Sequence, residues 1–244
     1  MIPWNGQNYM YDLWNADQIL ESAMQNSVTW YFQALDQQSS LSSIKEYVKE
    51  IGYGNQLIDG DISSYWINSA LKISPVEQVE MLTKLYYNQF GFAPENVKAV
   101  KDSIRLYSMD EGILSGKTGT EEIDGLNTSG WFIGYVERDS HTYFFATNIQ
   151  SDKLASGPLA TELTFSILSD LNLWNSYQEW GADSSSFFSG KIHLYNLRNI
   201  QKTKRIFCQS NTAADIHSGK STRTNVLRVI ETLYKAVRTT WKKF

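Results

Sequence analysis

The sequence has one cysteine, three histidines and no long apolar run. Cys208 alone cannot form an intrachain disulfide or a cysteine-based metal site. The histidines, His141, His193 and His217, are far apart and have no metal-ligand spacing, which argues against a zinc hydrolase. No apolar stretch approaches the roughly 20 residues that span a bilayer. We therefore expect no metal site and no membrane segment in this chain.

The N-terminal residues also lack the basic and apolar regions of a secretory signal, so the chain as written is expected to stay in the cytoplasm. Hydrophobic residues make up 42% of the chain, enough for a sizeable core, and charged residues make up an ordinary 20%. Aromatic residues reach 14%. This content suits an extracytoplasmic hydrolase or a carbohydrate-binding protein and does not choose between them.

The net charge of −4 hides a division of the chain into two regions. Residues 1–190 hold 10 Lys+Arg and 24 Asp+Glu, a net of −14, whereas residues 191–244 hold 12 Lys+Arg and 2 Asp+Glu, a net of +10. A serine-rich break at 184–186 lies just before the change. We expect a domain over residues 1–174 and a basic tail of separate character over 175–244.

In the first half of the domain, the apolar residues are spaced as in amphipathic helices. This spacing predicts two helices within residues 15–37 that meet near Asn26-Ser27, and a third helix over 42–51. A stronger helix begins at Ser74-Pro75-Val76-Glu77, which places serine at the N-cap, proline at N1 and glutamate at N3. A further helix is predicted over 94–106.

After Gly112 the pattern changes to short segments rich in aromatic and β-branched residues. Segments 113–120, 130–136 and 142–147 are expected to be strands, the last two forming an antiparallel pair. An amphipathic helix over 159–171 closes this part, so the domain is predicted to be α+β. In the tail, 191–197 and 205–209 are candidate strands, and 225–241 is a candidate basic helix.

Several short motifs could carry chemistry. Lys117-Thr118-Gly119 puts a cation and a hydroxyl on one strand, and its glycine lets a ligand approach the backbone closely. Ser27-Val28-Thr29 stands at a helix junction, Tyr53-Gly54-Asn55 resembles a turn, and Trp66 precedes the segment 72–78. Taken singly, each has a plain structural interpretation as a cap, a turn or a core residue.

Taken together and in order, these motifs resemble the class D (oxacillinase-type) β-lactamases and, equally, the sensor domains of transmembrane β-lactam receptors. The resemblance covers residues 1–174 and implies a penicillin-recognising fold, in which helices flank an antiparallel sheet, without that fold's N-terminal strands and nucleophile helix. Members of the family are secreted or extracytoplasmic. The matching segments are 4–7, 24–28, 53–55, Trp66, 72–78, 117–120, 130–137 and 143–148.

The resemblance implies a substrate-binding role for the Lys-Thr-Gly strand. In the family this strand binds the β-lactam carboxylate, a role that falls here on Lys117 and Thr118, beside Gly119. The backbone N–H of the next residue, Thr120, is expected to help form the oxyanion hole. The arginine that completes the carboxylate site in many members has no counterpart between Arg138 and Arg198.

The resemblance also implies roles for two residues outside that strand. The serine matching Ser27 passes a proton to the leaving lactam nitrogen, although Thr29 replaces the usual Val or Asn two positions later. The tryptophan matching Trp66 steadies a carbamylated lysine, which is the general base of the family.

The nucleophile of the family lies in a Ser-x-x-Lys motif upstream of the segment that matches residues 4–7. The chain begins at that segment, so we expect the nucleophile and its lysine to be absent. Two internal matches, Ser42-x-x-Lys45 and Ser69-x-x-Lys72, fall where the family has ordinary structural residues. We therefore expect no carbamylated lysine, no other cofactor, and no β-lactamase activity from this chain alone.

Three functions remain open at this point. The first is a part of a class D β-lactamase. The second is the ligand-sensing domain of a β-lactam receptor, which is acylated and turns over very slowly. The third is a non-catalytic binding module. The expected partners are β-lactam antibiotics, with no nucleic acid for residues 1–174 and no oligomeric state specified. The tail is out-of-frame or fused sequence that does not fold usefully, a segment that packs on an exposed sheet edge through 191–197, or a binder of acidic surfaces, nucleic acid included.

Overall fold

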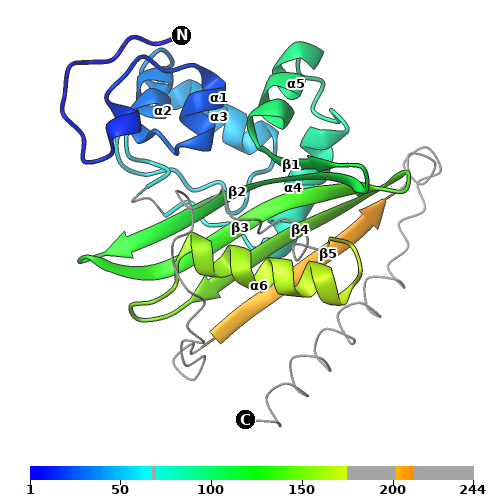
Figure 1. Cartoon of the computed structure of the whole chain (residues 1–244). Coiled ribbons are helices and arrows are strands. Elements are labelled where there is room, and N and C mark those ends of the chain that lie inside the picture. Colours follow the sequence, from blue (N-terminus) through cyan, green and yellow to red (C-terminus); the bar gives the residue numbers. More distant parts are fainter. Residues whose placement is uncertain (68–69, 175–201, 212–244) are drawn as a thin grey trace. The chain divides into compact units, whose positions relative to one another are not determined.

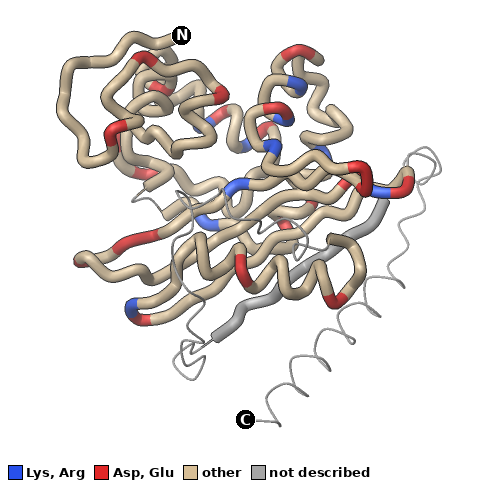
Figure 2. Tube along the Cα trace, in the orientation of Figure 1, with Lys and Arg blue, Asp and Glu red and all other residues tan. Residues whose placement is uncertain are grey.

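The computed structural model describes residues 1–67, 70–174 and 202–211 (Figure 1). The chain divides into two compact units, Met1–Tyr107 and Ser108–Phe244. Acidic residues outnumber basic ones along the described trace, as the composition of residues 1–190 requires (Figure 2). No helix among the described residues is long and apolar enough to cross a membrane.

The first unit is helical, and its apolar residues meet in a small aromatic core. Ala23, Val28, Trp30 and Tyr31 form the buried centre of this core. The predicted break between two helices near Ser27 is confirmed, because Ser27 has a positive φ of 52° and belongs to neither helix. The elements are the 3-10 helix η1 (Asp12–Trp14) and the helices α1 (Leu20–Gln25), α2 (Thr29–Asp36), α3 (Leu41–Glu50), α4 (Pro75–Tyr86) and α5 (Pro94–Ser103).

Helix α4 begins as its sequence predicts. The Ser74 side chain accepts a hydrogen bond from the Glu77 backbone N–H at 3.3 Å, and the Glu77 carboxylate accepts one from the Ser74 backbone N–H at 2.8 Å. Pro75 occupies the first turn, where its missing N–H costs nothing. The reciprocal bonds fix the start of the helix independently of its packing.

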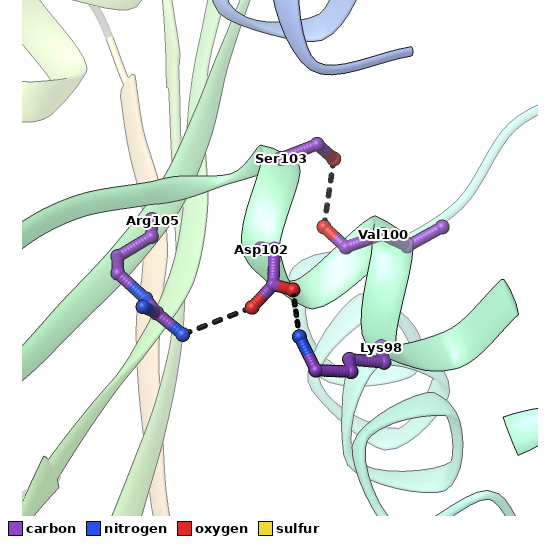
Figure 3. A network of polar contacts seen from close by, with 5 residues as sticks. All are labelled: Lys98, Val100, Asp102, Ser103 and Arg105. Atoms are coloured by element: carbon purple, nitrogen blue, oxygen red, sulfur yellow. Dashed lines mark hydrogen bonds and ion pairs between the residues drawn. The ribbon is translucent and has the colours of Figure 1, made fainter. Parts of the chain in front are cut away.

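Helix α5 is shorter than predicted, since it ends at Ser103 and the strand β1 (Arg105–Met109) follows. Figure 3 shows Asp102 bonded both to Lys98 within the helix and to Arg105 beyond its end. The bond from the Arg105 guanidinium to Asp102 is 3.0 Å long. The apolar spacing continues through Leu106, and sequence periodicity alone therefore did not locate the end of the helix.

The second unit is an antiparallel sheet with a helix across it. The strands β2 (Gly112–Ile123), β3 (Leu126–Arg138) and β4 (His141–Gln150) pair in sequence order, as predicted for the last two. Helix α6 (Gly157–Asp170) packs on β2, β3 and β4 (Figure 1). The buried core that this helix and the sheet share consists of Leu114, Phe132, Val136, Phe145, Ile149, Ala155, Ala160, Leu168 and Trp174.

A strand from the basic tail completes the sheet, whose order is β1-β2-β3-β4-β5. The strand expected over 205–209 is present and longer, as β5 (Lys202–Asn211). It runs antiparallel to β4, from Thr142 opposite Asn211 to Gln150 opposite Lys202. Part of the tail therefore covers the edge of β4. The candidate strand 191–197 and the candidate helix 225–241 lie outside the described residues.

Candidate functional site

Lys117, Thr118, Gly119 and Thr120 lie together on β2, as the sequence predicts. On one side they pair with β3, with Lys117 opposite Ile133 and Thr120 opposite Gly130. On the other side, β1 has only five residues against the twelve of β2, and a tight turn joins it to Gly112. Antiparallel pairing from that turn uses the first part of β2 only. Within the described chain, the 117–120 edge of β2 therefore has no strand beside it.

The N-terminus of α6 lies against this part of β2. The backbone N–H of Gly157, the first residue of α6, donates to the Thr120 hydroxyl at 2.9 Å. A Cβ atom added to Gly157 would lie 2.9 Å from the Thr118 Cβ and 3.0 Å from the Gly119 carbonyl oxygen, closer than side chains normally approach. The positive end of the α6 dipole is thus beside Thr118 and Thr120, where it favours an anion.

Lys117 provides the cation of the strand. Side chains alternate along a strand, so Lys117 projects to the face opposite Thr118 and Thr120. Its ammonium donates to the Thr118 carbonyl at 2.8 Å. The side chain is partly buried, and this burial lowers the pKa of Lys117 below the ordinary lysine value. The charge is consequently less well solvated than that of a surface lysine, which strengthens its attraction for an anion.

Residues of the neighbouring strands β3 and β4 determine how closely the same end of α6 approaches the sheet. A Cβ atom on Gly130 would lie 2.2 Å from the Ser156 carbonyl oxygen, so only glycine fits there. The buried Asn148 side chain donates to Ser129 Oγ at 3.0 Å and to the Gly130 carbonyl at 3.3 Å. Sequence reasoning included Gly130 and Asn148 in the matching segments without a role for either, and it missed Ser156, although a serine before Gly157 is a helix start that could have been recognised.

Ser27 lies in the first unit, at the junction of α1 and α2. Its side chain is exposed and its backbone is held in the left-handed region at φ 52°. The next residue, Val28, is fully buried and its N–H donates to the Ala23 carbonyl at 2.8 Å. A left-handed serine costs of order 1 kcal/mol or more, and the packing of Val28 maintains it. Such strain is common at functional positions.

Trp66 also lies in the first unit and remains 40% exposed. Its indole N–H donates to the carboxylate of Asp36, the last residue of α2, at 2.9 Å. Burial raises the pKa of Asp36, and the bonds from Trp66 and Tyr65 act in the opposite direction. Sequence reasoning did not identify Asp36, because no spacing within α2 distinguishes it.

The other motifs of the ordered set prove to be connected. The Asn55 N–H donates to the Lys72 carbonyl at 2.9 Å, and the Lys72 N–H returns a bond to the Asn55 side chain at 3.0 Å. Gly54 is required there, because a Cβ atom on it would lie 2.1 Å from the Lys72 carbonyl oxygen. The turn at 53–55 thus anchors the segment that leads into α4.

Of the two Ser-x-x-Lys matches, the structure describes both residues of the first and only the lysine of the second. Ser42 and Lys45 are exposed on α3, and the Ser42 hydroxyl is 2.8 Å from that of Ser40, the N-cap of the helix. This environment is that of an ordinary surface helix. Ser69 lies outside the described residues. Within the described part of the chain there is no group of three or more His, Cys, Asp or Glu side chains suited to a metal ion.

Comparison with known proteins gives strong matches. Regulatory protein BlaR1 of Bacillus licheniformis is 48% identical over 176 residues, which is 72% of this chain and 29% of BlaR1. The β-lactamase OXA-10 of Pseudomonas aeruginosa is 32% identical over 170 residues, 69% of this chain and 64% of OXA-10. The chain thus spans less than a third of the first relative and less than two thirds of the second.

The solved structures agree with these matches. The C-terminal domain of the Bacillus licheniformis BlaR penicillin-receptor has 47% identity and a TM-score of 0.67, over 71% of this chain and 70% of that structure. The predicted α+β fold is confirmed by this likeness. A family model described as the penicillin-binding protein transpeptidase domain matches residues 2–169. The chain therefore belongs to the penicillin-binding protein transpeptidase family, with class D β-lactamases and the BlaR receptor domain among its relatives.

Proposed function

We propose that the chain binds β-lactams through the 117–120 edge of β2. The observation that carries this proposal is the placement of the partly buried Lys117 cation on an edge of β2 that has no strand beside it within the described chain. A β-lactam of the penicillin type carries a carboxylate and a strained amide. The ammonium attracts the carboxylate, and an edge without a strand beside it within the described chain offers backbone groups to the amide.

The roles of the individual residues follow from serine acyl transfer, the chemistry expected of this family. Lys117 and the Thr118 hydroxyl bind the carboxylate, and the Thr120 backbone N–H stabilises the oxyanion. A preorganised donor of this kind lowers a barrier by about 3 kcal/mol. In a protein that also supplies the nucleophile, Ser27 would pass a proton to the lactam nitrogen as it leaves. Trp66 contributes to the environment of the general base.

We propose further that this chain alone binds β-lactams without hydrolysing them. Of the two internal Ser-x-x-Lys matches, Ser42 and Lys45 are exposed on a capped surface helix, which is not the setting of a nucleophile, and Ser69 lies outside the described residues. The expected result is no turnover of nitrocefin and no mass increase of the purified chain after incubation with benzylpenicillin. Turnover of nitrocefin by the chain would contradict this part of the proposal.

The receptor is the second candidate function, and the identity to one receptor favours it. The identity to BlaR1 of Bacillus licheniformis is 48%, against 36% to the probable β-lactamase YbxI of Bacillus subtilis. The DNA upstream of the Met1 codon separates the two candidates. Transmembrane helices there, followed by Ser-x-x-Lys, support a receptor, whereas a signal peptide followed by Ser-x-x-Lys supports a secreted enzyme.

Substitution of the strand residues tests the binding site itself. Lys117→Ala is expected to weaken benzylpenicillin binding by about 10- to 100-fold, since it removes a bond between charged groups. Thr118→Val should cause a smaller loss. Lys153→Ala, at an exposed lysine of the same unit, is the matched control and should leave the affinity unchanged. Equal affinities of the Lys117 and Lys153 variants, measured by calorimetry, would exclude the site.

A further inference from the structure

One carboxylate in the first unit accepts hydrogen bonds from two neighbouring aromatic side chains. Asp36 accepts a hydrogen bond from the Trp66 indole at 2.9 Å, and the Tyr65 hydroxyl is also hydrogen-bonded to it. One turn earlier on α2, the Gln33 side chain donates to the Ser63 carbonyl at 3.0 Å. Residues three apart lie on the same face of a helix, so Gln33 and Asp36 hold the 63–66 segment with two adjacent contacts.

The helix itself gains nothing from a carboxylate at this position. Asp36 is the last residue of α2, where the helix dipole disfavours a negative charge. Its partial burial is a second cost. What the carboxylate supplies in return is a charged acceptor for Trp66 and Tyr65, and hydrogen bonds to a charged group are about twice as strong as neutral ones.

We propose that Asp36 is the positioning residue for Trp66, and that the charge of its carboxyl group decides how firmly the Trp66 indole is held. The inference rests on the proposed function only for the place of Trp66 in the β-lactam site. Helix α2 then connects the two residues of that site in the first unit, because Ser27 lies two residues before its first residue and Trp66 is bonded to its last.

The direction of the pH effect follows from the groups around Asp36. Burial raises the pKa of Asp36 above the ordinary value, and the bonds from Trp66 and Tyr65 partly offset this. Tyr65 itself has its pKa raised to about 12, by burial and then by the Asp36 charge, with a smaller effect of Tyr53. Tyr65 therefore stays protonated while Asp36 titrates. Above the pKa of Asp36 the carboxylate holds the indole, and as the pH falls through that value the hold weakens.

The test follows the indole N–H signals in ¹H–¹⁵N spectra as the pH is lowered. Trp66→Phe identifies the Trp66 signal. This signal should move with a midpoint above about 4, the ordinary aspartate pKa. In Asp36→Asn the movement should disappear, and in Asp36→Glu it should return. The indoles of Trp14 and Trp30 donate to backbone carbonyls, so their signals are internal controls that should stay fixed and that report intact folding.

Asp61→Asn is the matched control variant, since Asp61 lies in the same segment and its carboxylate accepts bonds from the backbone N–H and the hydroxyl of Ser63. It should leave the Trp66 titration unchanged. A Trp66 signal that ignores both pH and Asp36→Asn, or that responds equally to Asp61→Asn, would overturn the proposal.

A separate measurement connects the residue with ligand binding. Asp36→Asn should weaken benzylpenicillin binding several-fold, and Asp61→Asn should not. If the unaltered chain binds no benzylpenicillin, the proposed function fails while the indole titration still decides the role of Asp36. If benzylpenicillin binds equally well to Asp36→Asn, the link between Asp36 and the site is refuted.

Discussion

Lys117 combines a functional charge with partial burial, and this makes the site sensitive to alkaline pH. Burial lowers the pKa of Lys117, so the ammonium is lost at a lower pH than that of an ordinary lysine. Affinity for benzylpenicillin should be constant near neutral pH and should fall as the pH rises through this lowered value. Lys117→Arg keeps its charge and should bind without that fall. An affinity that declines only above about pH 10.4, where ordinary lysines titrate, would contradict the assignment.

Two glycines beside the site differ in the space available for a Cβ atom. Alanine substitutions at the two positions therefore distinguish an effect on stability from an effect on ligand binding. A Cβ atom at Gly157 meets the Thr118 Cβ at 2.9 Å, whereas one at Gly119 meets only the Trp131 Cβ at an ordinary 3.7 Å. Gly157→Ala should lower the free energy of unfolding by about 1–3 kcal/mol, as overpacking does. Gly119→Ala should leave stability almost unchanged and weaken benzylpenicillin binding. Denaturant titrations that give equal stabilities for the two variants would refute this account.

At the scale of elements, the junction of α1 and α2 stores strain at Ser27. Because Ser27 has φ 52°, Ser27→Gly should be more stable than Ser27→Ala by about 0.5–1 kcal/mol, although both remove the hydroxyl. Urea unfolding of the two variants measures this difference. A glycine variant that is less stable than the alanine variant would show that the left-handed backbone at Ser27 is not a source of strain.

The elements also show which features a sequence can predict. The start of α4 was predictable because its cap is local: Ser74 and Glu77 satisfy one another within four residues. The strands β3 and β4 were predictable from their runs of aromatic and β-branched residues and the short turn between them. The end of α5 was not, because Arg105 leaves the helical pattern to join a sheet whose partner, β2, comes later in the chain. Tertiary pairing of this kind overrides local propensity.

The same division holds for the candidate site. Lys117, Thr118, Gly119 and Thr120 are consecutive, so the sequence alone placed them on one strand. The contacts that shape their surroundings come from residues far along the chain, such as Gly157. Asp36 escaped prediction for the same reason, since its partner Trp66 is 30 residues away. The order of the motifs identified the family. Which residues contact and support the site residues depends on tertiary packing, which the order of motifs does not give.

At the scale of the whole molecule, β5 makes part of the basic tail a component of the sheet. A chain that ends at residue 201 would leave the edge of β4 from Thr142 to Gln150 without this partner. Unpaired strand edges promote aggregation, so this variant should form large species in size-exclusion chromatography. A chain that ends at residue 211 retains β5 and is the matched control, expected to elute as the full chain does. Identical behaviour of the two truncated chains would mean that β5 does not protect the sheet.

The most direct test of the central claim is an amide ¹H–¹⁵N titration of the chain with benzylpenicillin. If the 117–120 edge of β2 binds β-lactams, the amide signals of Lys117, Thr118, Gly119 and Thr120 and that of Gly157 should shift together and saturate with one affinity. The shifts should reverse when the ligand is removed by dialysis. Saturating shifts confined to other parts of the chain, or no shift at millimolar ligand, would contradict the account.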